Sequence, residues 1–138
     1  AMKVLSGLQW IDRPYPDCTN LFRFTKSRDF ILDGCNFFNP LFVVYHCIKS
    51  NPELIERNEL EAFIMKVLDI IKQFRKNDHG FSFHLNKAQT KYYGVTVSRG
   101  LRESDLHGTS MMIWAMSVVA ELLRLMEYRV PGWELTLN

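Results

Sequence analysis

The sequence contains the uncharged stretch NPLFVVYHCI at residues 39–48, and this stretch decides the fold. Asn39 can cap the free backbone N–H groups of a helix, and Pro40 has the backbone angle of a first helical residue. Both features predict a helix that starts at Asn39-Pro40 and runs to about Ser50. Because its body has no polar face, this helix has to be buried on every side.

A second helix is predicted downstream, starting at Pro52 or Asn58 and ending near Lys76. Its apolar residues recur at the three-and-four spacing of one helical face, which predicts an amphipathic helix. These residues are Leu60, Phe63, Ile64, Val67, Leu68, Ile71 and Phe74.

A third helix is predicted from Ser104-Asp105, where either residue can cap its start, to about Tyr128, with Pro131-Gly132 after its end. Its segment 109–120 has no polar side and, like segment 40–49, needs cover all round. Two such helices are hard to enclose in a lone three-helix domain. We therefore expect further elements, beyond the three predicted helices, to bury these two helices. These elements would be either an outer ring of amphipathic helices or the neighbouring subunits of a tight homo-oligomer.

The segments outside these three helices are less regular. Residues 1–35 are punctuated by proline and glycine, and short helical turns are expected near 4–11 and 19–32. From 77 to 100, glycines separate β-prone runs, which predicts a small hairpin within a long loop. The sequence thus predicts a mainly α fold with a single domain, 1–138, and a long irregular loop between the second and third main helices.

Composition and charge exclude several classes of protein. The 138 residues carry 17 basic and 15 acidic side chains of interspersed sign, so no nucleic-acid footprint is indicated. The longest run without a charged residue or a histidine, 108–120, has 13 residues and is too short to span a bilayer. Three cysteines without a C-x-x-C pair indicate reduced thiols and a cytoplasmic location. Ala1-Met2 looks like the junction left by a cleavage, so the chain is expected to be an excised part of a longer protein.

One set of motifs resembles a known family. The run DHGFS at 78–82, then Ser104-Asp105 and Thr109 before the apolar IWAM at 113–116, is similar to one repeat of the terpenoid cyclases and protein prenyltransferases. The segment 36–41 looks like the start of another inner helix of that family. The resemblance implies a helical layer or a fragment of an α/α toroid. It transfers no catalytic residue, because the family's Asp-x-Asp-Asp proton donor and its zinc ligands are absent from this sequence.

The most polar segment of the chain leads directly into the most apolar helix. If that helix is central, Glu103, Asp105 and His107 gather at the mouth of a cavity, where they could act as general acid and base. The alternative is structural. In that case Ser104 or Asp105 caps the helix, Glu103 favours its dipole, and Thr109 bonds back to the helix backbone.

Asp33, Asn36 and Asn39 surround the start of the other apolar helix. If the two apolar helices run parallel, these three residues share one rim with the polar segment and form a ligand-binding site with it. Arg99 and Arg102 could assist there, because a helix N-terminus attracts anions.

Four aromatic residues, Phe81, Phe83, Tyr92 and Tyr93, lie on the predicted loop. Exposed rings on loops can stack on sugars or contact isoprenoid chains, so we assign them to the ligand site. The alternative is that they fold back as a lid over the core. No metal or cofactor is predicted, because the four histidines lack ligand spacing and the common nucleotide and dinucleotide motifs are missing.

Two functions remain open from the sequence. In the first, the chain is part of a larger toroid protein and lines a cavity for a carbohydrate or a polyprenyl-type ligand. In the second, it is a non-catalytic helical module that self-associates or binds a partner through the surface left by its apolar helices. The sequence specifies no reaction.

Overall fold

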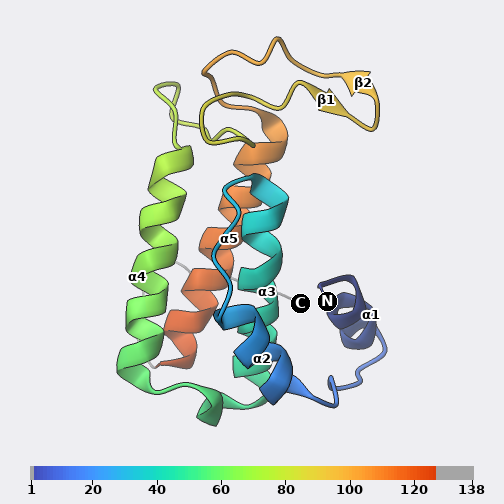
Figure 1. Ribbon diagram of the computed structural model, residues 1–138, viewed down its shortest axis with the longest axis vertical. Helices are drawn as coiled ribbons and strands as arrows, with labels where there is room; N and C mark the ends of the chain where they lie inside the picture. Colours follow the sequence, from blue (N-terminus) through green and yellow to red (C-terminus); the bar gives the residue numbers. More distant parts are fainter. Residues whose placement is uncertain (1, 127–138) are drawn as a thin grey trace.

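The structure, a computed structural model, describes residues 2–126. The mainly helical fold that the sequence predicts is confirmed. Helices α3 and α5 run parallel side by side, and α4 runs antiparallel beside them (Figure 1). The elements are α1 (Met2–Trp10), α2 (Cys18–Lys26), α3 (Gly34–Ser50), the 3-10 turn η1 (Pro52–Leu54), α4 (Arg57–Phe74), β1 (Lys91–Tyr92), β2 (Val95–Thr96) and α5 (Leu106–Leu125).

Helix α3 begins at Gly34, earlier than the predicted start at Asn39-Pro40. The reason is Asp33, whose side chain accepts a hydrogen bond of 2.9 Å from the backbone N of Asn36 and so caps the helix upstream. Pro40 therefore lies inside the helix, where it removes one ladder hydrogen bond.

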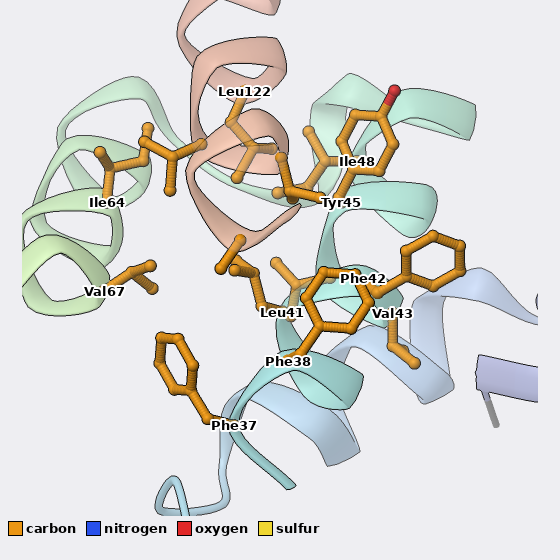
Figure 2. Close-up of a cluster of buried hydrophobic side chains, with 14 of the residues drawn as sticks. Phe37, Phe38, Leu41, Phe42, Val43, Tyr45, Ile48, Ile64, Val67 and Leu122 are labelled. Carbon is orange, nitrogen blue, oxygen red and sulfur yellow. The ribbon is translucent and has the colours of Figure 1, made fainter. Parts of the chain in front are cut away.

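Segment 41–48 of α3 forms the centre of the core, as predicted. Its side chains are buried except for the half-buried His46. Figure 2 shows Leu41, Phe42, Val43, Tyr45 and Ile48 of this segment in one cluster with Leu122 of α5 and with Ile64 and Val67 of α4. Much of the burial that this helix was expected to need comes from α1, α2, η1 and α5, which all pack on it.

Helix α5 has one side that is exposed to solvent, which the sequence did not predict. Met112, Ala115 and Leu122 are fully buried against α3 and α4, but Ile113 and Trp114 are 51% and 46% exposed. The prediction that segment 109–120 has no exposed side is therefore wrong. We define the open face of α5 as the exposed residues Leu106, Ser110, Ile113 and Trp114, which recur at helical spacing.

Helix α5 is also long and apolar enough, at 20 residues, to cross a membrane by length and composition alone. The core helix of a globular protein meets the same criterion, and much of α5 packs against α3 and α4. The predicted end of this helix near Tyr128 and the stop at Pro131-Gly132 lie outside the described residues.

The connection between α4 and α5 contains the predicted hairpin. Strands β1 and β2 pair antiparallel through a tight turn at Tyr93 and Gly94, both of which have positive φ. The connection crosses the ends of the bundle at which α3 and α5 begin (Figure 1). Helix α4 starts at Arg57, close to the second of its two predicted starts, and Pro52 belongs to η1.

Candidate functional site

Asp105 anchors the connection between α4 and α5. As N-cap of α5 it accepts a bond of 2.7 Å from the backbone N of Gly108 with one oxygen. Its other oxygen accepts from the backbone N atoms of Phe83 and Gln89, at 2.7 and 3.0 Å. The capping alternative is therefore confirmed for Asp105. Because both oxygens are engaged with backbone, this side chain positions the loop rather than facing a ligand.

The residues that carry the family resemblance form one hydrogen-bonded unit with this anchor. One carboxylate oxygen of Asp78 accepts from the backbone N and the hydroxyl of Ser104, at 3.0 and 2.9 Å. These bonds lower the pKa of Asp78 below its ordinary value. The hydroxyl of Thr109 bonds both the backbone N and the backbone O of Phe81 at 3.1 Å. The motif thus holds the loop on the start of α5.

Gly108 is required for this contact. A Cβ at this position would lie 2.2 Å from the backbone N of Phe83 and from the backbone C of Ser82. Such an approach is possible only for glycine, so the loop backbone lies directly against the first turn of α5.

The first turns of α3 and α5 meet in a cluster of thiol, imidazole and carboxamide groups. Cys35 and His107 are the second residues of their helices, and the Sγ of Cys35 lies 3.8 Å from the Nε2 of His107. The Nδ1 of His107 lies 2.8 Å from the Oε1 of Gln89. With the carboxamide oxygen placed at Nδ1, the tautomer that fits this contact has its proton on Nδ1 and uses Nε2 as the acceptor beside the thiol.

The ring of His107 is fixed by two aromatic neighbours. Phe83 stacks on it with ring centroids 4.6 Å apart, and Tyr92 contacts it edge-on at 5.2 Å. Gln89 is held as well, since its backbone N bonds Asp105 and its backbone O accepts from the hydroxyl of Ser98 at 2.8 Å. The imidazole therefore has one orientation, set from both sides.

The thiol of Cys35 is half-buried. Burial raises its pKa above the ordinary value, and the negative charge of Asp33 raises it further. The sulfur is thus a neutral S–H at rest, and a base is needed to make it a nucleophile. The group that lies beside it is the Nε2 of His107.

A pocket of about 440 Å³ opens beside this cluster. Three of its lining residues, Tyr92, Val97 and Leu106, present apolar surface. The other lining residues are Gln89, Ser98, Asp105 and His107. The side-chain oxygens of Asp105, Ser98 and Gln89 are already bonded to His107 or to backbone groups.

The predicted rim is present but is divided. The two apolar helices are parallel, as expected, and both of their N-terminal ends lie at one edge of the bundle. Asn36 and Asn39, however, line a different pocket of about 540 Å³ together with residues of α1 and α2. Asp33 caps α3 and also bonds the side chain of Asn36 at 2.8 Å. These three residues thus do not join the pocket that His107 lines.

The remaining predicted site residues have different surroundings. Arg99 and Arg102 are exposed on the loop, and Glu103 is half-buried. Tyr93 is 92% exposed at the hairpin turn. Phe83 is buried and stacks on His107. Phe81 packs against the core, as the lid alternative predicts, and lines a third pocket with Met116. Of the four loop aromatics, Tyr92 is the one that lines the pocket beside His107.

Cys35 and Gln89 were not identified from the sequence. Cys35 and His107 are separated by 72 positions, and the signal that could have paired them is that each follows a capping aspartate by two residues. Among residues 2–126 no group of three or more His, Cys, Asp or Glu side chains is placed to hold a metal ion.

Comparisons of the chain with models of protein families, with curated proteins and with solved structures found no significant match.

Proposed function

We propose that the pocket beside His107 binds a ligand with an apolar body and few polar groups, of polyprenyl type rather than carbohydrate. The observation that carries this proposal is that the residues lining the pocket present mainly apolar surface. Tyr92, Val97 and Leu106 offer apolar surface, whereas the side-chain oxygens of Asp105, Ser98 and Gln89 already have hydrogen-bond partners. Burying apolar surface yields about 25 cal/mol per Å², which makes these three side chains the main source of affinity.

A carbohydrate would need a different lining. Its hydroxyl groups lose water on binding and have to find new partners, or each buried hydroxyl costs about 1–3 kcal/mol. Both oxygens of Asp105 are taken by backbone N–H groups, and the Oε1 of Gln89 is taken by His107. The proposal therefore commits to one of the two ligand classes that the sequence left open.

The helix arrangement is compatible with a place in a larger toroid. In such a fold, inner helices run parallel to one another and an antiparallel outer helix joins each pair. Helices α3, α4 and α5 have this relation, and the open face of α5 is where a further helix pair would pack. This supports the proposal that the chain lines one part of a cavity.

The binding of farnesol and of maltose, followed by NMR shift changes, tests the proposal. We expect farnesol to shift the signals of Tyr92 and His107 and maltose to leave them unchanged. Leu106→Ser should weaken farnesol binding about tenfold, since most of one leucine side chain is lost from the contact. Met65→Ser, on the exposed side of α4, is the matched control. Binding of maltose alone, or equal effects of the two substitutions, would contradict the proposal.

The open face of α5 favours a second candidate function, self-association. Trp114 stacks on Phe38 with ring centroids 5.0 Å apart, yet its other side faces solvent next to Ile113. An exposed aromatic anchor of this kind is typical of an interface centre. Sedimentation velocity should show a dimer that Trp114→Ser disrupts and that Trp10→Ser, on exposed α1, does not. A monomer at every concentration would contradict this function.

A further inference from the structure

We propose that Cys35, His107 and Gln89 form a nucleophilic site that accepts an acyl group from an ester or thioester. The geometry has the three parts that such a site needs. The thiol is 3.8 Å from the Nε2 of His107, and the opposite ring nitrogen is 2.8 Å from the Oε1 of Gln89. A nucleophile, a base and a group that orients the base are thereby in line.

The base in this arrangement is fixed before any substrate arrives. Phe83 and Tyr92 hold the plane of the imidazole, and Gln89 selects the tautomer whose Nε2 faces sulfur. Because burial and Asp33 keep the thiol of Cys35 protonated at rest, the base has a proton to remove. The site thus activates the thiol only during attack, by general-base catalysis.

The start of α3 supplies a donor for the negative charge that develops in attack. Within residues 2–126, the backbone amides of residues 34, 36 and 37 donate to Phe83 or to Asp33. The amide of Cys35 is the member of this first turn that remains unpaired. Its N–H is the donor that this proposal assigns to an oxyanion beside Sγ.

The reaction balances with water as the co-substrate. Sulfur attacks the carbonyl carbon while Nε2 of His107 takes the thiol proton, and the tetrahedral intermediate expels the alcohol or thiol, which receives that proton. A thioester on Cys35 remains. Water then loses a proton to Nε2, attacks the thioester carbonyl and releases a carboxylic acid, and the proton returns to the sulfur of Cys35.

The preferred acyl group is apolar. This preference rests on the proposed function, because it takes the pocket lined by Leu106 and Tyr92 as the site that holds the acyl chain. The nucleophilic site itself does not depend on that pocket. An acetyl ester tests the site alone, and a longer acyl ester tests the pocket as well. Failure of the nucleophilic site and failure of the proposed pocket therefore give different results with the two esters.

The test compares two thiols in the same molecule. Cys18 is also half-buried, but its thiol bonds the backbone O of Tyr15 rather than a histidine. The intact protein is treated with p-nitrophenyl acetate, and acetylation of the two cysteine peptides is followed by mass spectrometry. We expect Cys35 to be acetylated about 100-fold faster, the lower end of the general-base range. Equal rates in the unaltered protein overturn the proposal.

Three variants and one control separate the roles. His107→Phe keeps a ring between Phe83 and Tyr92 but removes the base, so Cys35 should fall to the rate of Cys18. Gln89→Leu should lower the rate about tenfold, since it removes only the orienting group. Met65→Ser, on the exposed side of α4, should leave acetylation unchanged, whereas Leu106→Ser should abolish a preference for p-nitrophenyl octanoate over the acetate. A folded His107→Phe variant that keeps the full rate overturns the proposal.

Discussion

Helices α3 and α5 have the same kind of sequence but different surroundings. Ile48 on α3 is 2% exposed, whereas Ile113 on α5 is 51% exposed. The difference comes from the neighbours, because α1, α2 and η1 cover the side of α3 that faces away from α5, and the corresponding side of α5 has no cover within residues 2–126. An apolar stretch thus shows that a helix has to be shielded. It does not show whether the same chain provides the shield.

Substitution of the two isoleucines gives the largest expected contrast. Ile48→Ala should lower the free energy of unfolding by about 2–5 kcal/mol, since it leaves a cavity in the core. Ile113→Ala should lower it by less than about 1 kcal/mol, because the side chain keeps much of its contact with water. Urea unfolding of both variants measures this. Similar losses would show that the open face of α5 is buried in solution.

The starts of α3 and α5 can be compared in the same way, through the aspartates that cap them. Asp105→Ala should cost about 3 kcal/mol, because it removes the cap and also leaves two loop amides without their acceptor. Asp33→Ala removes only local bonds to Asn36 and should cost about 1 kcal/mol. Thermal unfolding of the two variants checks the order. If Asp33→Ala is the more harmful change, the anchoring role of Asp105 is wrong.

A smaller effect is expected from pH at Asp78. Its pKa is lowered in the folded protein by the bonds from Ser104. The stabilisation is therefore present above the ordinary value of 3.8 and is lost as pH falls through the lower folded value. Asp78→Asn should flatten this acid-side slope of the melting temperature, while Asp69→Asn, which alters an exposed pair with Lys72 on α4, should not. If the melting temperatures of both variants depended on acid pH in the same way, the stabilising role of Asp78 would be contradicted.

Much of the fold could be predicted from local sequence because the three main helices have strong periodicity or apolar runs. The start of α3 could not, since Asn39-Pro40 has the signature of a helix start and only the structure shows that Asp33 caps the chain first. The open face of α5 could not be predicted either. No polar residue marks it apart from Ser110, so only the packing of the other helices reveals it.

The candidate site was predicted in part for a similar reason. His107, Asp105 and Tyr92 were identified because polar and aromatic residues precede an apolar helix, and they do line one pocket. Cys35 was missed because its partner is 72 positions away and is brought close only by the parallel packing of α3 and α5. Asn36 and Asn39 were grouped with them on the condition that the two apolar helices run parallel. The helices do run parallel, but Asn36 and Asn39 line another pocket.

Thiol labelling of the native protein tests the central claim, that α3 is enclosed and α5 has an open face. Cys47 on α3 is fully buried, and burial together with Cys18 raises the pKa of its thiol to about 12. In an Ile113→Cys variant, we predict that position 113 reacts at once with a maleimide and that Cys47 reacts only on unfolding. Equal labelling rates at the two positions would contradict the account.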